Sequence, residues 1–103
     1  MKKVNIVVYM LCALCLLCAA CSSDTAYRIG VSQCGAGQWR EKVNQEMLAA
    51  QHLYEEDVKV SIACAYDDTE RQIRQIDSLA NSGIDLLVVA PNEETPVSEA
   101  ITR

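Results

Sequence analysis

Beyond an apolar leader, the sequence predicts an α/β fold: a truncated three-layer parallel sheet with its strands in the order 2-1-3. Strand-like segments at 26–33, 58–64 and 84–90 alternate with helical segments. The third segment is apolar almost throughout, which is typical of a strand buried on both faces of a parallel sheet. The second alternates between apolar and polar residues, which suits a sheet edge. Right-handed crossovers then place the first strand between the other two.

The leader has the composition of a secretory signal. Residues 1–3 are Met-Lys-Lys, and residues 4–20 are almost entirely apolar. As a helix, this apolar segment would span about 25 Å, slightly less than the ~30 Å hydrocarbon core of a membrane. We therefore assign residues 1–20 to a signal peptide, 21–26 to a spacer and 27–103 to the domain.

Four of the six cysteines recur every third residue in this region, namely Cys12, Cys15, Cys18 and Cys21. Metal and iron–sulfur sites need thiolates in a polar setting, so this spacing within an apolar signal does not predict a metal centre. The residues from Leu17 to Cys21 resemble a bacterial lipobox, although Cys18 stands where leucine is usual. Cleavage after Ala20 without lipidation fits the small-residue rule about as well. A lipid anchor at Cys21 and release of a soluble domain are both open.

The charge of the domain argues against several partners. Lys2 and Lys3 are two of the nine basic residues, so residues 21–103 carry seven basic and fourteen acidic side chains, a formal charge of −7. Without basic clusters, this balance argues against nucleic acid and anionic membrane surfaces as partners. The membrane is expected as a partner only through the signal segment or a lipid anchor.

The first half of the domain predicts a strand, a glycine-containing loop and a helix. Residues 26–33 form the strand, and Cys34-Gly35-Ala36-Gly37 forms the loop. The helix begins at Gln38, and its apolar residues recur at helical spacing, as in a stripe that faces a core. These residues are Trp39, Val43, Met47, Ala50 and Tyr54.

The second half predicts two further helices around the third strand. Thr69 and Gln72 have the spacing of a capping box at the start of one helix. Gly83 stands where the end of that helix favours a positive φ. Thr95 and Pro96 predict the N-cap and first position of the last helix. The stripe expected to face the core comprises Ile73, Ile76, Leu79 and Ala80.

Ligands of open parallel sheets bind beyond the carboxyl ends of the strands, near the switch point of strand order. This rule selects residues 32–39, 66–68 and 90–94. The glycines do not form a Gly-x-Gly-x-x-Gly loop, and no nucleophile–base pair or metal-ligand spacing occurs. A phosphoacceptor receiver domain would place its acidic pair after strand one, whereas Asp67 and Asp68 follow strand two. We therefore expect a binding module, not an enzyme, with no cofactor and no metal.

Three stretches resemble the type I periplasmic binding proteins, the ribose-binding and LacI-like sugar-binding fold. They are Ile-Gly-Val-Ser at 29–32, Gln-Ile-x-x-Ile-x-x-Leu-x-x-x-Gly-Ile-Asp at 72–85, and the apolar strand that ends at Pro91. Trp39-Arg40 and Ala-Pro-Asn-Glu at 90–93 are most similar to the N-terminal sensor domains of hybrid two-component histidine kinases. The resemblance covers residues 27–103 and implies a periplasmic domain that binds a monosaccharide.

The resemblance also implies which residues contact the sugar. They are Ser32, Gln38, Trp39, Asp67 and Asn92. Trp39 would stack on the sugar ring, or it would instead begin the core stripe of its helix. Asp67 and Asp68 would accept hydrogen bonds from hydroxyls, although helix capping is the stronger expectation for at least one of them. Relatives carry asparagine where this chain has Ala90, and Asn92 is the candidate to replace it.

Two roles are consistent with this resemblance: the sensory part of a hybrid histidine kinase, or the sugar-binding lipoprotein of an ABC transporter. Type I binding proteins close two lobes, each of roughly 100 residues or more, around their ligand. This sequence supplies half of one lobe, so the missing C-terminal domains are expected partners. Alone, it should be poorly stable or aggregation-prone and show no sugar affinity by calorimetry. Cys34 and Cys64 are expected to be free thiols.

Overall fold

The computed structural model describes residues 3–6, 25–54 and 56–103. The predicted signal peptide, apart from one helical turn at residues 3–6, and the predicted lipidation site Cys21 lie outside the described residues. In the part of the chain that is described, no helix has the length and apolar character needed to cross a membrane.

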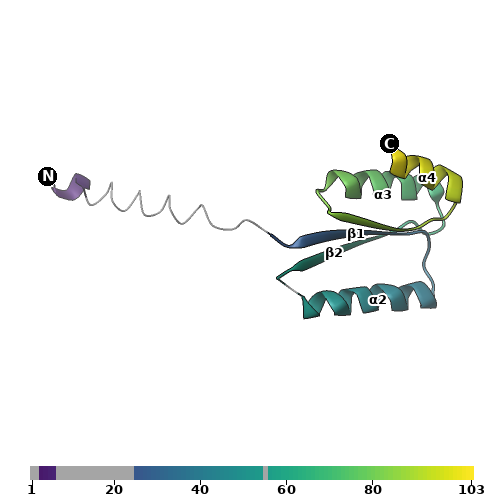
Figure 1. Ribbon diagram of the computed structural model, residues 1–103, viewed down its shortest axis with the longest axis horizontal. Coiled ribbons are helices and arrows are strands. Elements are labelled where there is room, and N and C mark those ends of the chain that lie inside the picture. Colours follow the sequence, from purple (N-terminus) through teal and green to yellow (C-terminus); the bar gives the residue numbers. More distant parts are fainter. Residues whose placement is uncertain (1–2, 7–24, 55) are drawn as a thin grey trace.

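The domain alternates strands and helices as the sequence predicts. Its elements are β1 (Tyr27–Gln33), α2 (Gln38–Leu53), β2 (Val58–Cys64), α3 (Thr69–Asn81), β3 (Leu86–Ala90) and α4 (Glu94–Thr102). The three strands form one sheet in the order β2-β1-β3, and both strand pairs are parallel (Figure 1). The predicted order 2-1-3, with strand one in the centre, is confirmed.

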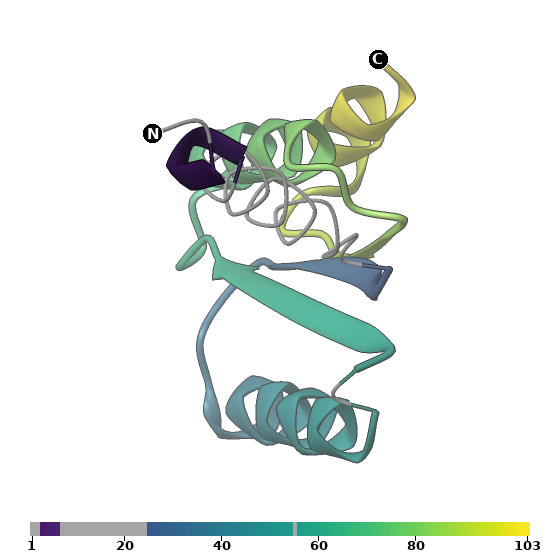
Figure 2. The ribbon, with the colours of Figure 1, turned by 90° about the vertical axis from the view of Figure 1, so that its left-hand side faces the viewer.

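The helices lie on both faces of the sheet and give the domain three layers. Helix α2 lies on one side of the strands, and α3 and α4 lie together on the other (Figures 1 and 2). In the β1 register, Ile29 pairs with Val60 and Leu86. Side chains at paired positions of parallel strands share a face, and successive residues alternate between faces. These three side chains therefore belong to the α2 face.

The face covered by α3 and α4 forms the closed part of the core. Ile76 of α3 is 2% exposed, and Val97 and Ala100 of α4 are also buried. Gly30 lies at the centre of β1 on this face. A methyl group on Gly30 would come within 2.9 Å of the Ile84 side chain and 3.3 Å of the Leu79 side chain of α3, so glycine permits the close approach of α3 and the loop after it to the sheet.

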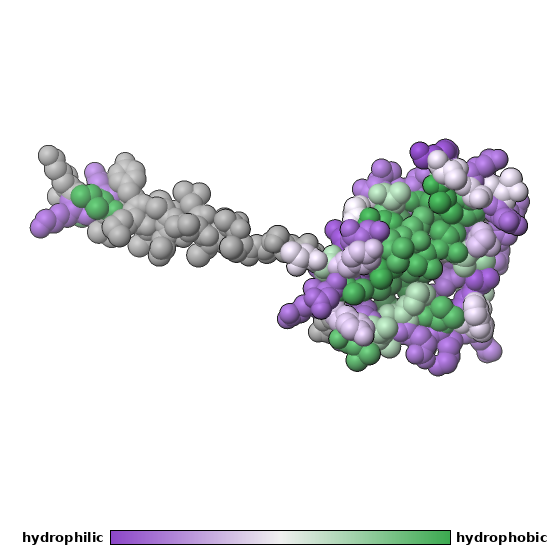
Figure 3. Space-filling view, in the orientation of Figure 1, coloured by the Kyte–Doolittle hydropathy of each residue, from purple (hydrophilic) through white to green (hydrophobic). Residues whose placement is uncertain are grey.

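The opposite face is only partly covered. No residue of α2 is buried, and a cavity of about 320 Å³ lies between α2 and the sheet. Leu86 and Val88 of β3 are 45% and 42% exposed there. Figure 3 shows apolar residues gathered at the level of the strands. The expectation of a third strand at 84–90 buried on both faces is therefore wrong: β3 begins at Leu86, and α2 does not extend over its outer residues.

Both predicted helix starts in the second half also need correction. The N-cap of α3 is Asp68, not Thr69, and the N-cap of α4 is Glu93, so Pro96 is the third helical residue. The predicted capping box does not form because the Gln72 side chain is buried and bonded elsewhere. At the end of α3, Gly83 has φ 78°, as predicted.

Candidate functional site

Three loops meet at the edge of the sheet where the strands end. They follow β1 (residues 34–37), β2 (65–68) and β3 (91–93). Because all three strands are parallel, their carboxyl ends lie on the same side of the domain. The candidate site is built from these loops and the first turns of the helices that follow them (Figure 1).

The side chain of Gln72 links the ends of β1 and β3 from the α3 side of the sheet. This side chain is fully buried, and Nε2 donates to Ser32 Oγ at 3.1 Å and to the carbonyl oxygen of Ala90 at 2.9 Å. Its Oε1 accepts from the backbone N–H of Asn92 at 2.8 Å. Ser32 is itself fully buried, on the face of the sheet toward α3. The structure therefore places this predicted ligand residue beneath the site, where its hydroxyl supports the loop after β3.

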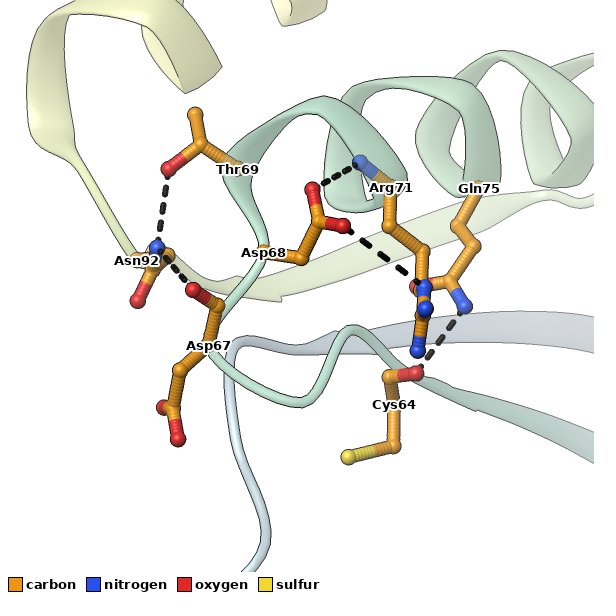
Figure 4. Close-up of polar contacts among 7 residues, drawn as sticks. All are labelled: Cys64, Asp67, Asp68, Thr69, Arg71, Gln75 and Asn92. Carbon is orange, nitrogen blue, oxygen red and sulfur yellow. Dashed lines mark hydrogen bonds and ion pairs between the residues drawn. The ribbon is translucent and has the colours of Figure 1, made fainter.

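Asn92 holds the loop after β3 against the loop after β2. Its side-chain Nδ2 donates to the backbone oxygen of Asp67 at 3.3 Å and to Thr69 Oγ1 at 2.8 Å (Figure 4). Thr69 Oγ1 in turn donates to Glu93 Oε1 at 2.7 Å. Both amide protons of Asn92 are used in this way. Among the described residues its Oδ1 accepts no hydrogen bond, which leaves one polar atom for a ligand.

Asp67 lies on the loop after β2 in an unusual backbone conformation. Tyr66 and Asp67 have φ values of 53° and 62°, in the left-handed region that non-glycine residues seldom adopt. The Asp67 N–H donates to the Cys34 carbonyl at 2.7 Å, and its carboxylate lies against Gly35. In Figure 4 this carboxylate points away from Asn92. The loop therefore presents an exposed hydrogen-bond acceptor beside the loop after β1.

Asp68 has a different role from its neighbour. Its Oδ1 accepts from the Arg71 N–H at 2.9 Å, as an N-cap does, and its Oδ2 lies 4.0 Å from Arg71 Nε (Figure 4). Helix capping, the stronger expectation for one of the two aspartates, is confirmed for Asp68. The acidic pair is thus divided between a cap and an exposed acceptor.

Trp39 and Gln38 open helix α2 at the same rim. Both are exposed, and the Trp39 side chain is 71% accessible. Of the two roles open for Trp39, the structure excludes membership of the core stripe. A large apolar ring left in water at the carboxyl end of β1 is a suitable platform for a sugar ring, whose C–H face is also apolar. Tyr54, at the other end of the predicted stripe, is 58% exposed as well.

Four further residues at or beneath this rim were not among the predicted contacts. The Arg40 guanidinium carbon lies 5.9 Å from the centre of the Trp39 ring, and Arg40 Nη1 donates to Gln33 Oε1 at 3.2 Å. Tyr66 is 64% exposed, with the guanidinium of Arg71 5.9 Å from its ring. The sequence contained one indication of this group, because Gln33 is a polar residue at the last position of the central strand, where ligands of such sheets bind. Tyr66 lies inside the segment 66–68 that the switch-point rule selects.

The two cysteines near the site do not form a disulfide. Cys64 pairs with Gln33, the last residue of β1, so Cys34 lies just beyond the paired part of the sheet and not opposite Cys64. A disulfide needs Cβ atoms that point toward each other. Both side chains are free thiols, as expected. Across the described ranges no three histidine, cysteine, aspartate or glutamate residues are grouped as metal ligands.

Comparison with protein-family profiles gave no match, and comparison with curated proteins gave none either. A solved structure is similar to this chain: the fructose-binding periplasmic domain of the hybrid two-component system BT1754, with 36% sequence identity and a TM-score of 0.69. The chain has the type I periplasmic binding fold. The similarity covers 73% of this chain and 25% of that chain, so the chain spans about a quarter of the similar structure.

The periplasmic binding fold accounts for the shape of the candidate site. The strand order β2-β1-β3 brings the three loops to one edge of the sheet, and two of the stretches that carry the resemblance in the sequence, 29–32 and 90–93, lie at or beside that edge. Of the five predicted contacts, Trp39, Gln38 and Asp67 are exposed at the rim, Asn92 is half-buried, and Ser32 lies beneath it. The predicted type I periplasmic binding fold is confirmed.

Proposed function

We propose that the domain is an extracytoplasmic monosaccharide-binding module that serves as the sensory part of a hybrid two-component histidine kinase. The similarity to a fructose-binding periplasmic domain of such a system carries the proposal. A periplasmic location agrees with a signal peptide at residues 1–20. The module has a sensing role and no catalytic one, and a kinase would belong to other domains of the same system.

Within this proposal, the sugar stacks on Trp39 and exchanges hydrogen bonds with polar groups around it. Asp67 supplies a carboxylate acceptor, while Gln38 and the free Oδ1 of Asn92 complete the polar set. Ser32 acts indirectly, because its buried hydroxyl holds Gln72 and through it the loop of Asn92. These residues form one side of a cleft whose other side belongs to a second lobe.

Since one side of a cleft offers few contacts, this chain alone should bind sugars only weakly. We expect calorimetry to detect no tight binding, because too little ligand surface is covered to offset the cost of association. Trp39 is the only tryptophan, so its indole N–H gives a single NMR signal at the site. D-fructose, D-ribose, D-glucose and D-galactose at high concentration should move that signal. A folded chain whose indole signal responds to none of the four would refute the proposal.

A sugar-binding lipoprotein of an ABC transporter is the second candidate, and the lipobox-like residues from Leu17 to Cys21 favour it. Metabolic labelling with a radioactive fatty acid in a bacterial host distinguishes the two. Label that is lost in a Cys21→Ser variant would support the lipoprotein. Unlabelled protein cleaved after Ala20 would favour the sensor.

A further inference from the structure

Arg40 differs from the other arginine at the rim because it has no acidic partner in the described part of the chain. Arg71 lies 4.0 Å from the carboxylate of Asp68, whereas within the described residues no carboxylate forms an ion pair with Arg40. The one hydrogen bond that Arg40 makes to the described residues is to a neutral amide, that of Gln33. Arg40 as a whole is half-buried.

Gln33 is built to hold this guanidinium in place. The side chain of Gln33 is the last of β1 and is 4% exposed, and its Nε2 donates to Asn44 Oδ1 at 2.9 Å. That bond directs Oε1 toward Arg40, whose Nη1 donates to it at 3.2 Å. A buried amide with both ends bonded cannot rotate without leaving a buried polar atom unpaired, which is costly. Arg40 is therefore fixed from the core of the domain and does not move freely in solvent.

The fixed guanidinium lies beside the ring that the proposed sugar would cover. Its carbon is 5.9 Å from the centre of the Trp39 ring, and that ring is 71% exposed. Only one of the five N–H groups of Arg40 is used within the described part of the chain. The remaining donors are available to an oxygen-rich molecule seated on Trp39.

From this arrangement, and resting on the proposed function, we propose that Arg40 is a specificity-determining residue that donates hydrogen bonds to a neutral monosaccharide stacked on Trp39, and that Gln33 is its positioning residue. The ligand is neutral because the same rim carries exposed carboxylates of Asp67 and Glu93, which repel an anion. Arg40 donates to sugar oxygens while Asp67 accepts from sugar hydroxyls. This pair of roles fits a polyol ring, whose hydroxyl groups both donate and accept.

The test follows the Trp39 indole signal of the chain by NMR during titration with D-fructose, D-glucose and D-glucuronate. The slope of the shift against sugar concentration measures relative affinity even without saturation. Arg40→Gln should reduce the slope for the neutral sugars about fivefold or more, in line with loss of a hydrogen bond from a charged donor. Lys42→Gln is the matched control, because it removes the same charge two residues away. The Lys42 side chain pairs with Glu46 on the exposed face of α2. This variant should leave the slope unchanged.

Gln33 needs a readout that separates positioning from folding. Gln33→Leu should reduce the slope in the wild-type background and have no further effect when combined with Arg40→Gln. Gln33→Glu keeps an acceptor for Arg40 and should restore most of the slope, whatever its effect on thermal stability. Equal loss from Gln33→Leu in both backgrounds would overturn the positioning role.

Three further results would each overturn a different part of the proposal. An unchanged slope for Arg40→Gln, with the wild type responding, would overturn the role of Arg40 and leave the proposed function intact. A wild-type chain that responds better to D-glucuronate than to D-glucose would overturn the neutral ligand class. A folded wild-type chain that responds to no sugar would refute the proposed function, and this inference with it.

Discussion

Gln72 and Gln75 are successive inward-facing glutamines of α3, yet the structure gives them unequal weight. Gln72 is fully buried and bonds Ser32, Ala90 and Asn92. Gln75 donates to the Cys64 carbonyl, and its buried Oε1 finds no partner among the residues that the structure describes. Replacing a buried side chain that makes hydrogen bonds leaves its partners without one, at a cost of about 1–3 kcal/mol for each unsatisfied group. The same substitution at the two positions therefore compares the loss of a side chain that links three segments with the loss of one that makes a single hydrogen bond.

We expect Gln72→Leu to lower the free energy of unfolding by roughly 2–4 kcal/mol, since several buried polar partners lose their bonds at once. Gln75→Leu should cost less, because it also removes an unpaired buried oxygen. Urea unfolding followed by circular dichroism measures both. Hydrogen exchange at the Asn92 amide should accelerate only in Gln72→Leu. Equal destabilisation by the two variants would contradict the central role of Gln72.

Gly35 and Gly37 offer a second matched pair at the residue scale. A Cβ on Gly35 would overlap the carboxylate of Asp67, whereas a Cβ on Gly37 would meet no atom within 4 Å. Gly35→Ala should therefore displace the Asp67 carboxylate and destabilise the domain by about 0.5–1 kcal/mol, a modest cost because the displaced atoms are the exposed end of a flexible side chain. Gly37→Ala should change stability by less than about 0.5 kcal/mol. Thermal unfolding compares the two, and an unperturbed Gly35→Ala variant would show that Asp67 is not held where the structure places it.

At the scale of elements, the start of α3 depends on a single side chain. Asp68 accepts from the Arg71 N–H, and the Thr69 hydroxyl is committed to Glu93 and Asn92. Asp68→Ala should cost about 1 kcal/mol of stability, the usual loss for an N-cap. Asp68→Ser keeps a capping oxygen and should remain close to the wild type in urea unfolding. If Thr69→Ala proved the more damaging change to helix content, Asp68 would not be the cap that matters.

The strand order, the first two strands and the start of α2 could be predicted from the sequence, whereas the start of β3 and the caps of α3 and α4 could not. The periodicity of residues 58–64 and the glycine at 83 are local signals, and the structure agrees with both. The start of α3 depends on where the Gln72 side chain goes, and only the packed strands offer it Ser32 and Ala90. Local spacing contains no information about such distant partners.

The candidate site shows the same division between local and distant information. The switch-point rule selected the correct loops, because parallel strands bring their carboxyl ends together whatever their side chains. It did not distinguish the buried Ser32 from the exposed Trp39. Ser32 is the second-last residue of a strand and Trp39 the second residue of a helix, and at each position a side chain can face either the core or the ligand. Arg40 was not singled out as a contact because its partner Gln33 lies seven residues earlier, in another element.

For the molecule as a whole, the open face of the sheet is the dominant feature. The cavity between α2 and the strands is about 320 Å³ and is apolar in lining, with Leu86 and Val88 exposed at its side. Within the described residues β3 pairs only with β1, and its sequence Leu-Leu-Val-Val-Ala has no charge or proline to discourage pairing with another chain. Free edges of this kind promote association.

We therefore expect the chain to self-associate as its concentration rises, with a weight-average mass above that of the monomer in sedimentation velocity. Val88→Lys places a charge on the open apolar face and should shift the distribution toward monomer. Ser61→Lys is the control, because it makes the same change of charge at an exposed position of β2. Ser61 pairs with Gly30 and therefore lies on the face of the sheet toward α3, not on the open face. If both lysine variants reduce association equally, net charge and not the β3 face controls solubility. If neither does, the open face is not the surface through which the chains meet.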